Sequence, residues 1–294
     1  MMENLFKPVF KKYKKRRPRP DFSGVIDFRK PEWLTPEKLG EHRLRMKELY
    51  SDERMTTSED EKLAYDLGLN PMKTWRLAEF IDRPGLFILP SVIRKDQAYR
   101  WVKEVLSYAK SPNTTNCKIH RAEDLTLEEK CAGTLRWTTL GIEYDWNSKE
   151  YPQSGRKIPE ELSQIAYLIT KSLGMKIMTP DAAIINYYPP KTALSPHVDK
   201  SERSNAPLIS VSLGQPAVYL AGGLTLSEAP IPVMLRHGDI LIMSGEQRLV
   251  YHAVPCIGPE KESYEEFKKE SDDLLIREYV NNARVNVTIR QVNP

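Results

Sequence analysis

The sequence contains 294 residues, of which 40% are hydrophobic and 29% are charged, and its formal net charge is +4. This length and composition are typical of a soluble globular protein with one large domain or two small ones, and we find neither a secretory signal nor an apolar run long enough to span a membrane. The three cysteines, Cys117, Cys131 and Cys256, are scattered and lack metal-site spacing. They argue against a disulfide framework, so we expect a reducing compartment. Because no apolar run is long enough, we expect no membrane partner.

The first 20 residues form a basic segment with eight basic residues, one acidic residue and a net charge of +7. Its apolar residues recur at helical spacing, which predicts a helix that can dock on the body while its lysines face outward. Pro8 is compatible with this helix only in the first turn. The segment is interpreted as a solubilising tail, a contact with nucleic-acid phosphates, a nuclear import signal or part of a mitochondrial presequence. The nucleus and the mitochondrion are the expected compartments, with the cytoplasm as an alternative.

The middle of the chain predicts mostly helices. In chain order we expect a charged helical stretch over 36–69, a strand over 86–90, an amphipathic helix over 96–110, a polar and loop-rich stretch over 111–130 and a second helix over 162–173.

From residue 181 onward, short strands follow one another between Gly and Pro turns. The predicted strands cover residues 181–188, 208–213, 217–220, 233–235, 239–243 and 284–290. Many short strands without a helical repeat indicate an α+β protein whose core is a two-sheet jelly roll, or double-stranded β-helix. Such a roll encloses a cavity that can hold a metal and a small cofactor.

A candidate metal site follows the first of these strands. His197 and Asp199 are two residues apart, so both point to the same side of an extended segment, and His252 lies downstream as a third candidate ligand. Two imidazoles and one carboxylate leave the opposite face of a metal open, which is the ligand set of non-heme Fe(II) oxygenases. The alternative is a chance motif, because a lone histidine is more often a satisfied core or surface residue.

The last predicted strand carries polar and apolar residues on opposite faces. Arg284, Asn286, Thr288 and Arg290 share one face, and valines and an isoleucine form the other. Two arginines beside an asparagine are costly to bury without anionic partners, and arginine is suited to binding a carboxylate through two parallel hydrogen bonds. The strand therefore predicts a site for a small dianion inside a barrel. A solvated edge strand is the alternative.

An aromatic and basic cluster precedes the predicted barrel. It consists of Arg136, Trp137, Tyr144 and Trp146. Aromatic rings interleaved with cations can stack a splayed base and hold its phosphate. The alternative places Trp137 and Trp146 in the hydrophobic core.

The ordered set of these motifs resembles the AlkB family of Fe(II)- and 2-oxoglutarate-dependent dioxygenases, and within it the eukaryotic homologue 1 branch. The resemblance covers nearly the whole chain, is strongest from residue 181 onward and is weakest over 34–73. It is carried by Asn-Tyr-Tyr at 186–188, His-Val-Asp-Lys-Ser-Glu at 197–202, Ser-Leu-Gly-Gln at 212–215, Arg-Gln-Val at 290–292, Gly-Val-Ile-Asp-Phe at 24–28 and the segment 135–146.

The resemblance implies ligands for Fe(II) and contacts for 2-oxoglutarate, with molecular oxygen as co-substrate. It assigns His197, Asp199 and His252 to the iron. It assigns the far carboxylate of 2-oxoglutarate to Arg284, with Tyr188 and Asn286 as hydrogen-bond donors. It places Asn186 and Arg290 near the carboxylate that binds the iron.

The distance along the strand supports separate roles for the two arginines. In a straight strand Arg284 and Arg290 start about 20 Å apart, at roughly 3.3 Å per residue. They cannot both bind one carboxylate unless the strand bends. We therefore expect them at opposite ends of the cofactor.

The resemblance further implies oxidation of methyl groups on bases in nucleic acid. The favoured substrate is tRNA that carries 1-methyladenosine or 5-methylcytosine, and locally unpaired DNA with N6-methyladenine or 3-methylcytosine is also expected. The target base must be flipped out or already unpaired. Bacterial repair members read the damaged base with an acidic residue where this sequence has Ser201, so a bacterial-type preference for cationic bases is in doubt.

Two other functions remain open at this point. One is oxidation of a protein side chain, such as methylated histone lysine, by the same centre. The other is an RNA-binding module whose metal site is structural. We expect a monomer with a basic N-terminal helical extension over 1–84 and a dioxygenase domain over 85–294, which contains a substrate lid near 135–150 and the jelly-roll core over 181–294.

Overall fold

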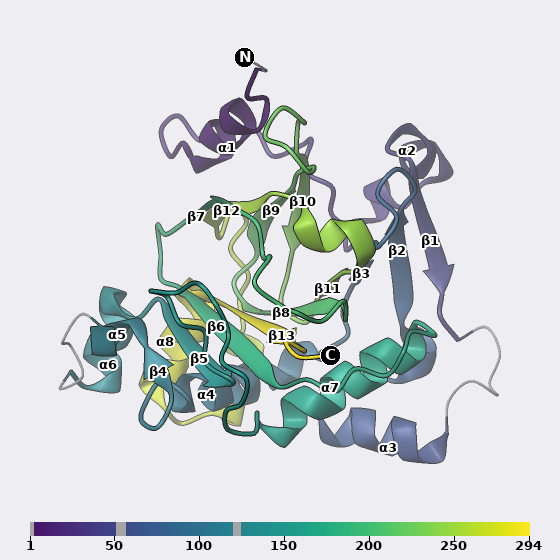
Figure 1. The fold of residues 1–294 in the computed structure, drawn as a ribbon. Helices are drawn as coiled ribbons and strands as arrows, with labels where there is room; N and C mark the ends of the chain where they lie inside the picture. Colours follow the sequence, from purple (N-terminus) through teal and green to yellow (C-terminus); the bar gives the residue numbers. More distant parts are fainter. Residues whose placement is uncertain (1–2, 51–56, 120–124) are drawn as a thin grey trace.

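The computed structural model describes residues 3–50, 57–119 and 125–294. Within these residues, a larger and a smaller antiparallel sheet pack against each other, and helices cover the outer face of the larger sheet (Figure 1). This arrangement of two antiparallel sheets confirms the predicted jelly-roll core and the α+β class.

The bounds of the elements are as follows. The larger sheet contains, in sheet order, β1 (Leu44–Glu48), β2 (Arg76–Phe80), β3 (Leu86–Leu89), β11 (Ile240–Met243), β8 (Leu208–Gly214), β13 (Arg284–Arg290), β6 (Ala182–Tyr188), β5 (Trp137–Gly141) and β4 (Thr114–Thr115). The smaller sheet contains β10 (Ile231–Leu235), β9 (Ala217–Ala221), β12 (His252–Ile257) and β7 (Leu194–His197). The helices are α1 (Phe6–Lys14), α2 (Pro36–Glu41), α3 (Ser58–Asp66), α4 (Ala98–Ser107), α5 (Asn116–Ile119), α6 (Leu127–Glu129), α7 (Glu160–Ser172) and α8 (Leu274–Asn282).

Strand β13 lies between β8 and β6 in the interior of the larger sheet, and all of its residues are buried. Its apolar residues Val285, Val287 and Ile289 belong to the main hydrophobic core, together with residues of α4, α7 and α8. Its polar residues line a cavity between the two sheets. The predicted alternation is confirmed. The solvated edge strand is wrong, because β13 has a hydrogen-bonded neighbour on both sides.

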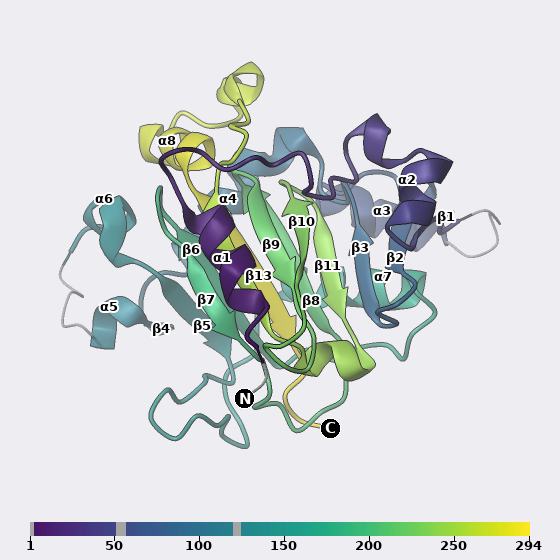
Figure 2. The ribbon, with the colours of Figure 1, turned by 90° about the horizontal axis from the view of Figure 1, so that it is seen from above.

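Helix α1 lies across the outer face of the smaller sheet (Figure 2). Phe6, Phe10 and Tyr13 are buried in a cluster that includes Val218 of β9. Pro8 falls in the first turn of the helix, where its missing N–H costs no helical hydrogen bond. The predicted docking of the basic segment is therefore confirmed, and its lysines are exposed.

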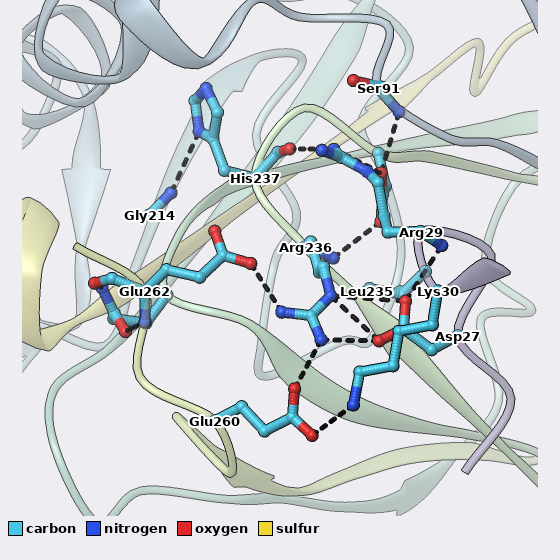
Figure 3. A network of polar contacts seen from close by, with 12 residues as sticks. Asp27, Arg29, Lys30, Ser91, Gly214, Leu235, Arg236, His237, Glu260 and Glu262 are labelled. Carbon is cyan, nitrogen blue, oxygen red and sulfur yellow. Dashed lines mark hydrogen bonds and ion pairs between the residues drawn. The ribbon is translucent and has the colours of Figure 1, made fainter. Parts of the chain in front are cut away.

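A network of charged side chains joins the segment after α1 to the barrel (Figure 3). Arg236, in the turn after β10, pairs with Asp27 at 2.5 Å and with Glu260 and Glu262 at 2.7 Å each. Lys30 also pairs with Glu260, at 2.6 Å. Arg236 and Asp27 are buried, so this network holds residues 27–30 on the barrel.

One predicted element is wrong. The charged stretch 36–69 contains strand β1 in addition to helices α2 and α3. This strand is polar and mostly exposed, and its lysine and arginine pair with one acid on β2: Lys47 lies 2.8 Å and Arg45 lies 3.6 Å from Glu79. The strand has only two apolar residues, Leu44 and Met46, and this short alternation is lost among the many charged residues of the stretch, which is why the pattern predicts a helix there.

The other predicted helices are confirmed as α4 and α7, each with slightly different ends. The stretch 111–130 contains only short elements among its described residues, and 120–124 lie outside the description. Strands β2 and β3 pair with each other on either side of residues 84 and 85, and the domain division expected there remains a prediction. In the described part of the chain, no helix is both long and apolar enough to cross a membrane.

Candidate metal centre and cofactor pocket

Three candidate ligands meet where the strands β7 and β12 pair. His197 ends β7, His252 begins β12, and the two residues face each other in the antiparallel register. Asp199 follows β7 by two residues. One ligand atom from each of these residues lies within 4.8 Å of the others. The structure thus brings together the three residues that the sequence placed in one candidate site.

The imidazole rings are oriented by carbonyl groups two residues before each histidine. The Nδ1 atom of His197 lies 2.9 Å from the carbonyl oxygen of Ser195, and that of His252 lies 3.2 Å from the carbonyl oxygen of Val250. A proton on each Nδ1 satisfies these carbonyls. Both Nε2 lone pairs then remain free to bind a cation.

The electrostatics of the cluster favour the metal-binding protonation states. Burial lowers the pKa of His252 to about 4, and the neighbouring His197 acts in the same direction. Burial would raise the pKa of Asp199, but Arg290 and the two histidines hold it well below its ordinary value. At neutral pH the cluster therefore offers a neutral imidazole and a carboxylate to a divalent cation.

A cavity of 360 Å³ opens beside this cluster, between the two sheets. The polar face of β13 forms one wall, and the candidate ligands form part of another. Its lining includes Asn186, Tyr188, Arg284, Asn286 and Arg290. Its size is that of a small-molecule site.

Arg284 is a buried cation that lacks a carboxylate partner. The side chain is 2% exposed, and no carboxylate of a described residue lies within 4.0 Å of it. It donates to the carbonyl of Leu235 at 3.3 Å and to the Ser212 hydroxyl at 2.9 Å, and its Nε atom has no partner. A buried charge in this state is costly, so an anion in the cavity would complete the site.

Tyr188 also lines this cavity. Burial raises the pKa of Tyr188 to about 12, while the charge of Arg284 acts to lower it. Tyr188 is opposite Arg284 in the β6–β13 register. The tyrosine is therefore a neutral hydrogen-bond donor beside an unpaired guanidinium, which together suit a carboxylate.

Arg290 has a different environment at the other end of β13. Its guanidinium pairs with Asp199 at 3.0 Å and also contacts Glu202, which in turn pairs with Arg248 at 3.0 Å. Although burial acts to lower the pKa of Arg290, these carboxylates raise it. Arg290 therefore holds Asp199 in place, while its Nε atom has no protein partner.

The two asparagines are placed less simply. Asn186 lines the cavity and lies opposite Asn286 in the sheet. Both N–H groups of Asn286 are already engaged, with the Ser210 hydroxyl at 2.7 Å and the carbonyl of Val211 at 3.0 Å. A hydrogen bond from Asn286 to a cofactor would require one of these bonds to be released.

The predicted substrate contacts separate into two groups. Tyr144, Trp146 and Ser201 line the cavity, whereas Arg136 and Trp137 do not. Trp137 contacts Trp146 with its ring tilted by 32° and the ring centroids 4.7 Å apart, and Tyr144 meets Trp146 edge-on at 4.8 Å. Neither tryptophan is a core residue, because Trp137 is half-buried and Trp146 is 42% exposed. These rings form an aromatic platform, defined here as Trp137, Tyr144 and Trp146.

Residues 85–290 match the family model of the 2OG-Fe(II) oxygenase superfamily. The chain belongs to this superfamily. It is 30% identical over 332 residues to the nucleic acid dioxygenase ALKBH1 of Homo sapiens, an alignment that covers 99% of this chain and 84% of that protein. It is 37% identical over 181 residues to the tRNA demethylase abh1 of Schizosaccharomyces pombe, which covers 60% of this chain and 59% of that protein.

The solved structure of OsALKBH1 has the same fold, with a TM-score of 0.53 and 23% sequence identity over 71% of this chain and 97% of that chain. The resemblance to the AlkB family is thus confirmed, and the protein is a dioxygenase that uses Fe(II) and 2-oxoglutarate. The site fits both groups, since it offers a His–Asp–His cluster and an unpaired buried arginine to a dianion.

The sequence did not predict two residues, Glu202 and Arg248, that help to hold Arg290 beside Asp199. Glu202 is buried between Arg290 and Arg248, and its only sequence signal is its place in the run 197–202. Arg248 lies in a 3-10 turn at Gly245–Leu249, far from Glu202 in the chain. No local pattern indicates that contact, because it arises only when the sheets close.

Proposed function

We propose that this oxygenase removes or oxidises methyl groups on bases of nucleic acid, with tRNA as its leading substrate. The observation that carries the proposal is the aromatic platform beside the cavity that contains the His–Asp–His cluster. A flipped or unpaired base can stack on such rings, and each base–aromatic stack contributes about 1–3 kcal/mol. The names of the human and fission-yeast relatives, a nucleic acid dioxygenase and a tRNA demethylase, support the substrate class.

Each part of the site has a role in this proposal. His197, Asp199 and His252 would hold Fe(II) on one side and leave the other side open. Arg284 and Tyr188 would bind the far carboxylate of 2-oxoglutarate. The bound iron and cofactor supply the oxidation of a substrate methyl group, and a hydroxymethyl group on nitrogen then leaves as formaldehyde.

The protein must also place the base and exclude water from the cavity. Tyr144 and Trp146 at the cavity offer stacking surfaces, and Ser201 offers a neutral hydroxyl instead of an acidic group. Ser201 donates to the hydroxyl of Tyr144 at 3.5 Å. This neutral environment favours recognition of base shape over recognition of positive charge. Among the expected tRNA modifications, the neutral base 5-methylcytosine therefore fits this position better than 1-methyladenosine, whose ring carries a positive charge at neutral pH, and the name of the fission-yeast relative supports tRNA before DNA.

The test is incubation with total tRNA, Fe(II), ascorbate and 2-oxoglutarate, followed by mass spectrometry of the nucleosides. Parallel reactions contain locally unpaired methylated DNA or a methylated histone peptide, and Asp199→Ala serves as the inactive control. We expect a loss of methylated nucleoside from tRNA and a matching release of succinate. Succinate release stimulated by the peptide alone would instead assign a protein substrate, and no stimulation by any substrate would favour a binding module.

The platform has its own test. Trp146→Ala should weaken tRNA binding by roughly 5- to 150-fold, the equivalent of one lost base stack. Tyr65→Ala is the matched control, since Tyr65 is 69% exposed and does not line the cavity. Decarboxylation of 2-oxoglutarate without substrate should be unchanged in both variants. Equal tRNA affinity in Trp146→Ala and the parent would remove the platform from the proposed site.

A further inference from the structure

A second cavity, of 240 Å³, lies where the end of helix α1 meets the loop before β7 and the end of β12. We call it the basic hollow. No acidic side chain belongs to its lining among the described residues. The cationic residues of the lining are Lys14, Lys15, Arg16, Arg19 and Lys191.

These cations have no carboxylate partner within ion-pair distance in the described part of the chain. Among residues 3–50, 57–119 and 125–294, none of the five forms an ion pair within 4.0 Å. Arg16 donates to the carbonyl of Lys191, and the guanidinium of Arg19 lies 5.6 Å from the ring centroid of Phe22. Like charges that converge on one concavity repel each other, and a bound anion would relieve this.

A simpler explanation accounts for only part of the cluster. Cations in the last turn of a helix interact favourably with its dipole, which explains Lys14. It does not explain Arg19, which lies beyond the helix, or Lys191, which comes from a different loop. Residues distant in the sequence thus contribute positive charge to the same hollow.

The cations are presented on an ordered surface. Tyr13 is buried beneath α1 and stacks on Phe22, with ring centroids 5.8 Å apart. Phe6 and Phe10 fix the rest of the helix on the smaller sheet. A positively charged site that is already ordered loses less conformational entropy on binding than a mobile tail does.

The hollow lies at the opposite end of β7 and β12 from the metal cluster. Lys191 precedes His197 by six residues and Ile257 follows His252 by five, so at roughly 3.3 Å per residue the two sites are at most about 16–20 Å apart along the chain. Successive phosphates of one strand rise about 3.4 Å along a duplex axis, so this span corresponds to about five or six phosphates.

We propose that the basic hollow binds a backbone phosphate of the nucleic acid whose modified base enters the active-site cavity. This inference rests on the proposed function, because it assumes a polynucleotide substrate. The contact would add affinity that is independent of sequence and sensitive to salt. It would also make long substrates bind better than short oligonucleotides that cannot reach the hollow.

The experiment compares two double variants with the same change in charge. Lys15→Gln with Arg19→Gln removes two cations from the hollow, and Lys7→Gln with Lys11→Gln removes two exposed cations from α1 outside it. Lys191→Gln tests the contribution of the other loop. The affinity of each variant for tRNA is measured by fluorescence anisotropy at several salt concentrations.

We expect only the hollow variants to change the salt dependence. Two lost phosphate contacts lower the slope of log affinity against log salt by roughly 1.4–1.8, so the affinity ratio of parent to variant changes about tenfold between 50 and 200 mM salt. Turnover of a methylated dinucleotide should be unaffected, because its one internucleotide phosphate adjoins the target base and cannot reach the hollow. Equal slopes in the hollow and control variants would overturn the proposal.

A further measurement distinguishes a backbone contact from a site for free phosphate. The parent and the hollow variants are titrated calorimetrically with inorganic phosphate. If the hollow variants lose phosphate binding but keep the salt slope of the parent for tRNA, the hollow is a free-anion site and the backbone contact is wrong. The slopes are measured without turnover. A reduced slope in the hollow variants therefore supports the phosphate contact even if no methyl group is removed, whereas the proposed function fails on the nucleoside analysis alone.

Discussion

Replacement of Arg284 by methionine should remove most of the affinity for 2-oxoglutarate. Methionine keeps much of the stem but removes the guanidinium, a buried cation of the cavity that has no carboxylate partner among the described residues. In the parent, two of its donors are held by Leu235 and Ser212, so it is already fixed in position before an anion arrives. Loss of one partner of a buried ion pair costs about 3–5 kcal/mol, which is a factor of roughly 150–5,000 in Kd.

The same substitution should have the opposite effect on the protein without cofactor. Without cofactor, the guanidinium of Arg284 is a buried charge that lacks a carboxylate partner among the described residues. Its burial away from water lowers the pKa of Arg284. Its replacement by an apolar side chain of similar length should leave the free energy of unfolding unchanged or increase it. A ligand present at a hundred times its Kd raises the free energy of unfolding by about 2.7 kcal/mol. 2-Oxoglutarate at that concentration should stabilise the parent by this amount, and Arg284→Met should lose most of this stabilisation.

The assay is calorimetric titration of 2-oxoglutarate in the presence of Mn(II), combined with chemical unfolding with and without both ligands. Arg284→Lys should recover only part of the affinity, because lysine lacks the planar pair of donors. Arg76→Met, at an exposed position of β2 outside the cavity, is the control. If Arg284→Met binds 2-oxoglutarate as tightly as the parent does, the carboxylate is bound elsewhere and the reasoning is wrong.

Three other expectations concern the metal, the charged network and pH. Asp199→Ala should abolish turnover while cooperative unfolding, followed by circular dichroism, is retained; loss of both would mark the metal as structural. Asp27→Asn should lower the free energy of unfolding by about 3 kcal/mol, since it leaves the buried Arg236 with weaker partners, and an unchanged urea midpoint would contradict this. Burial lowers the pKa of His237 to about 4, so between pH 6.5 and 4 the unfolded chain binds a proton that the folded protein does not. His237 alone should therefore lower stability by up to about 3 kcal/mol as the pH falls, in addition to the loss from His252, and His237→Gln should remove this share in urea titrations at pH 5 and 7.

Local patterns in the sequence determined the parts of the site that lie close together in the chain. His197 and Asp199 were expected on one side because they are two residues apart, and the structure brings their ligand atoms together although β7 ends at His197. The alternation from Arg284 to Arg290 separates a polar face from an apolar one. Both features follow from the two-residue period of an extended chain, which does not depend on what lies beside it. The docking of α1 was predictable in the same way, from helical spacing.

Other features depend on which strands become neighbours. The sequence allowed β13 to be a wet edge strand, and only the pairing with β6 and β8 made it an interior strand with a buried polar face. Strand β1 escaped prediction because its apolar alternation is only two residues long and pairing with β2 defines it. The tryptophans of the platform could equally have been core residues.

The tertiary structure alone decided the electrostatic partners. Arg284 and Arg290 have the same side chain on the same face of one strand, yet Arg290 is neutralised by Asp199 and Glu202, while no carboxylate of the described residues pairs with Arg284. The basic hollow likewise requires Lys191 to meet the end of α1. Charge interactions act over a few ångströms in space, and the distance between two such groups is set by sheet closure and loop paths, which no local period in the sequence records.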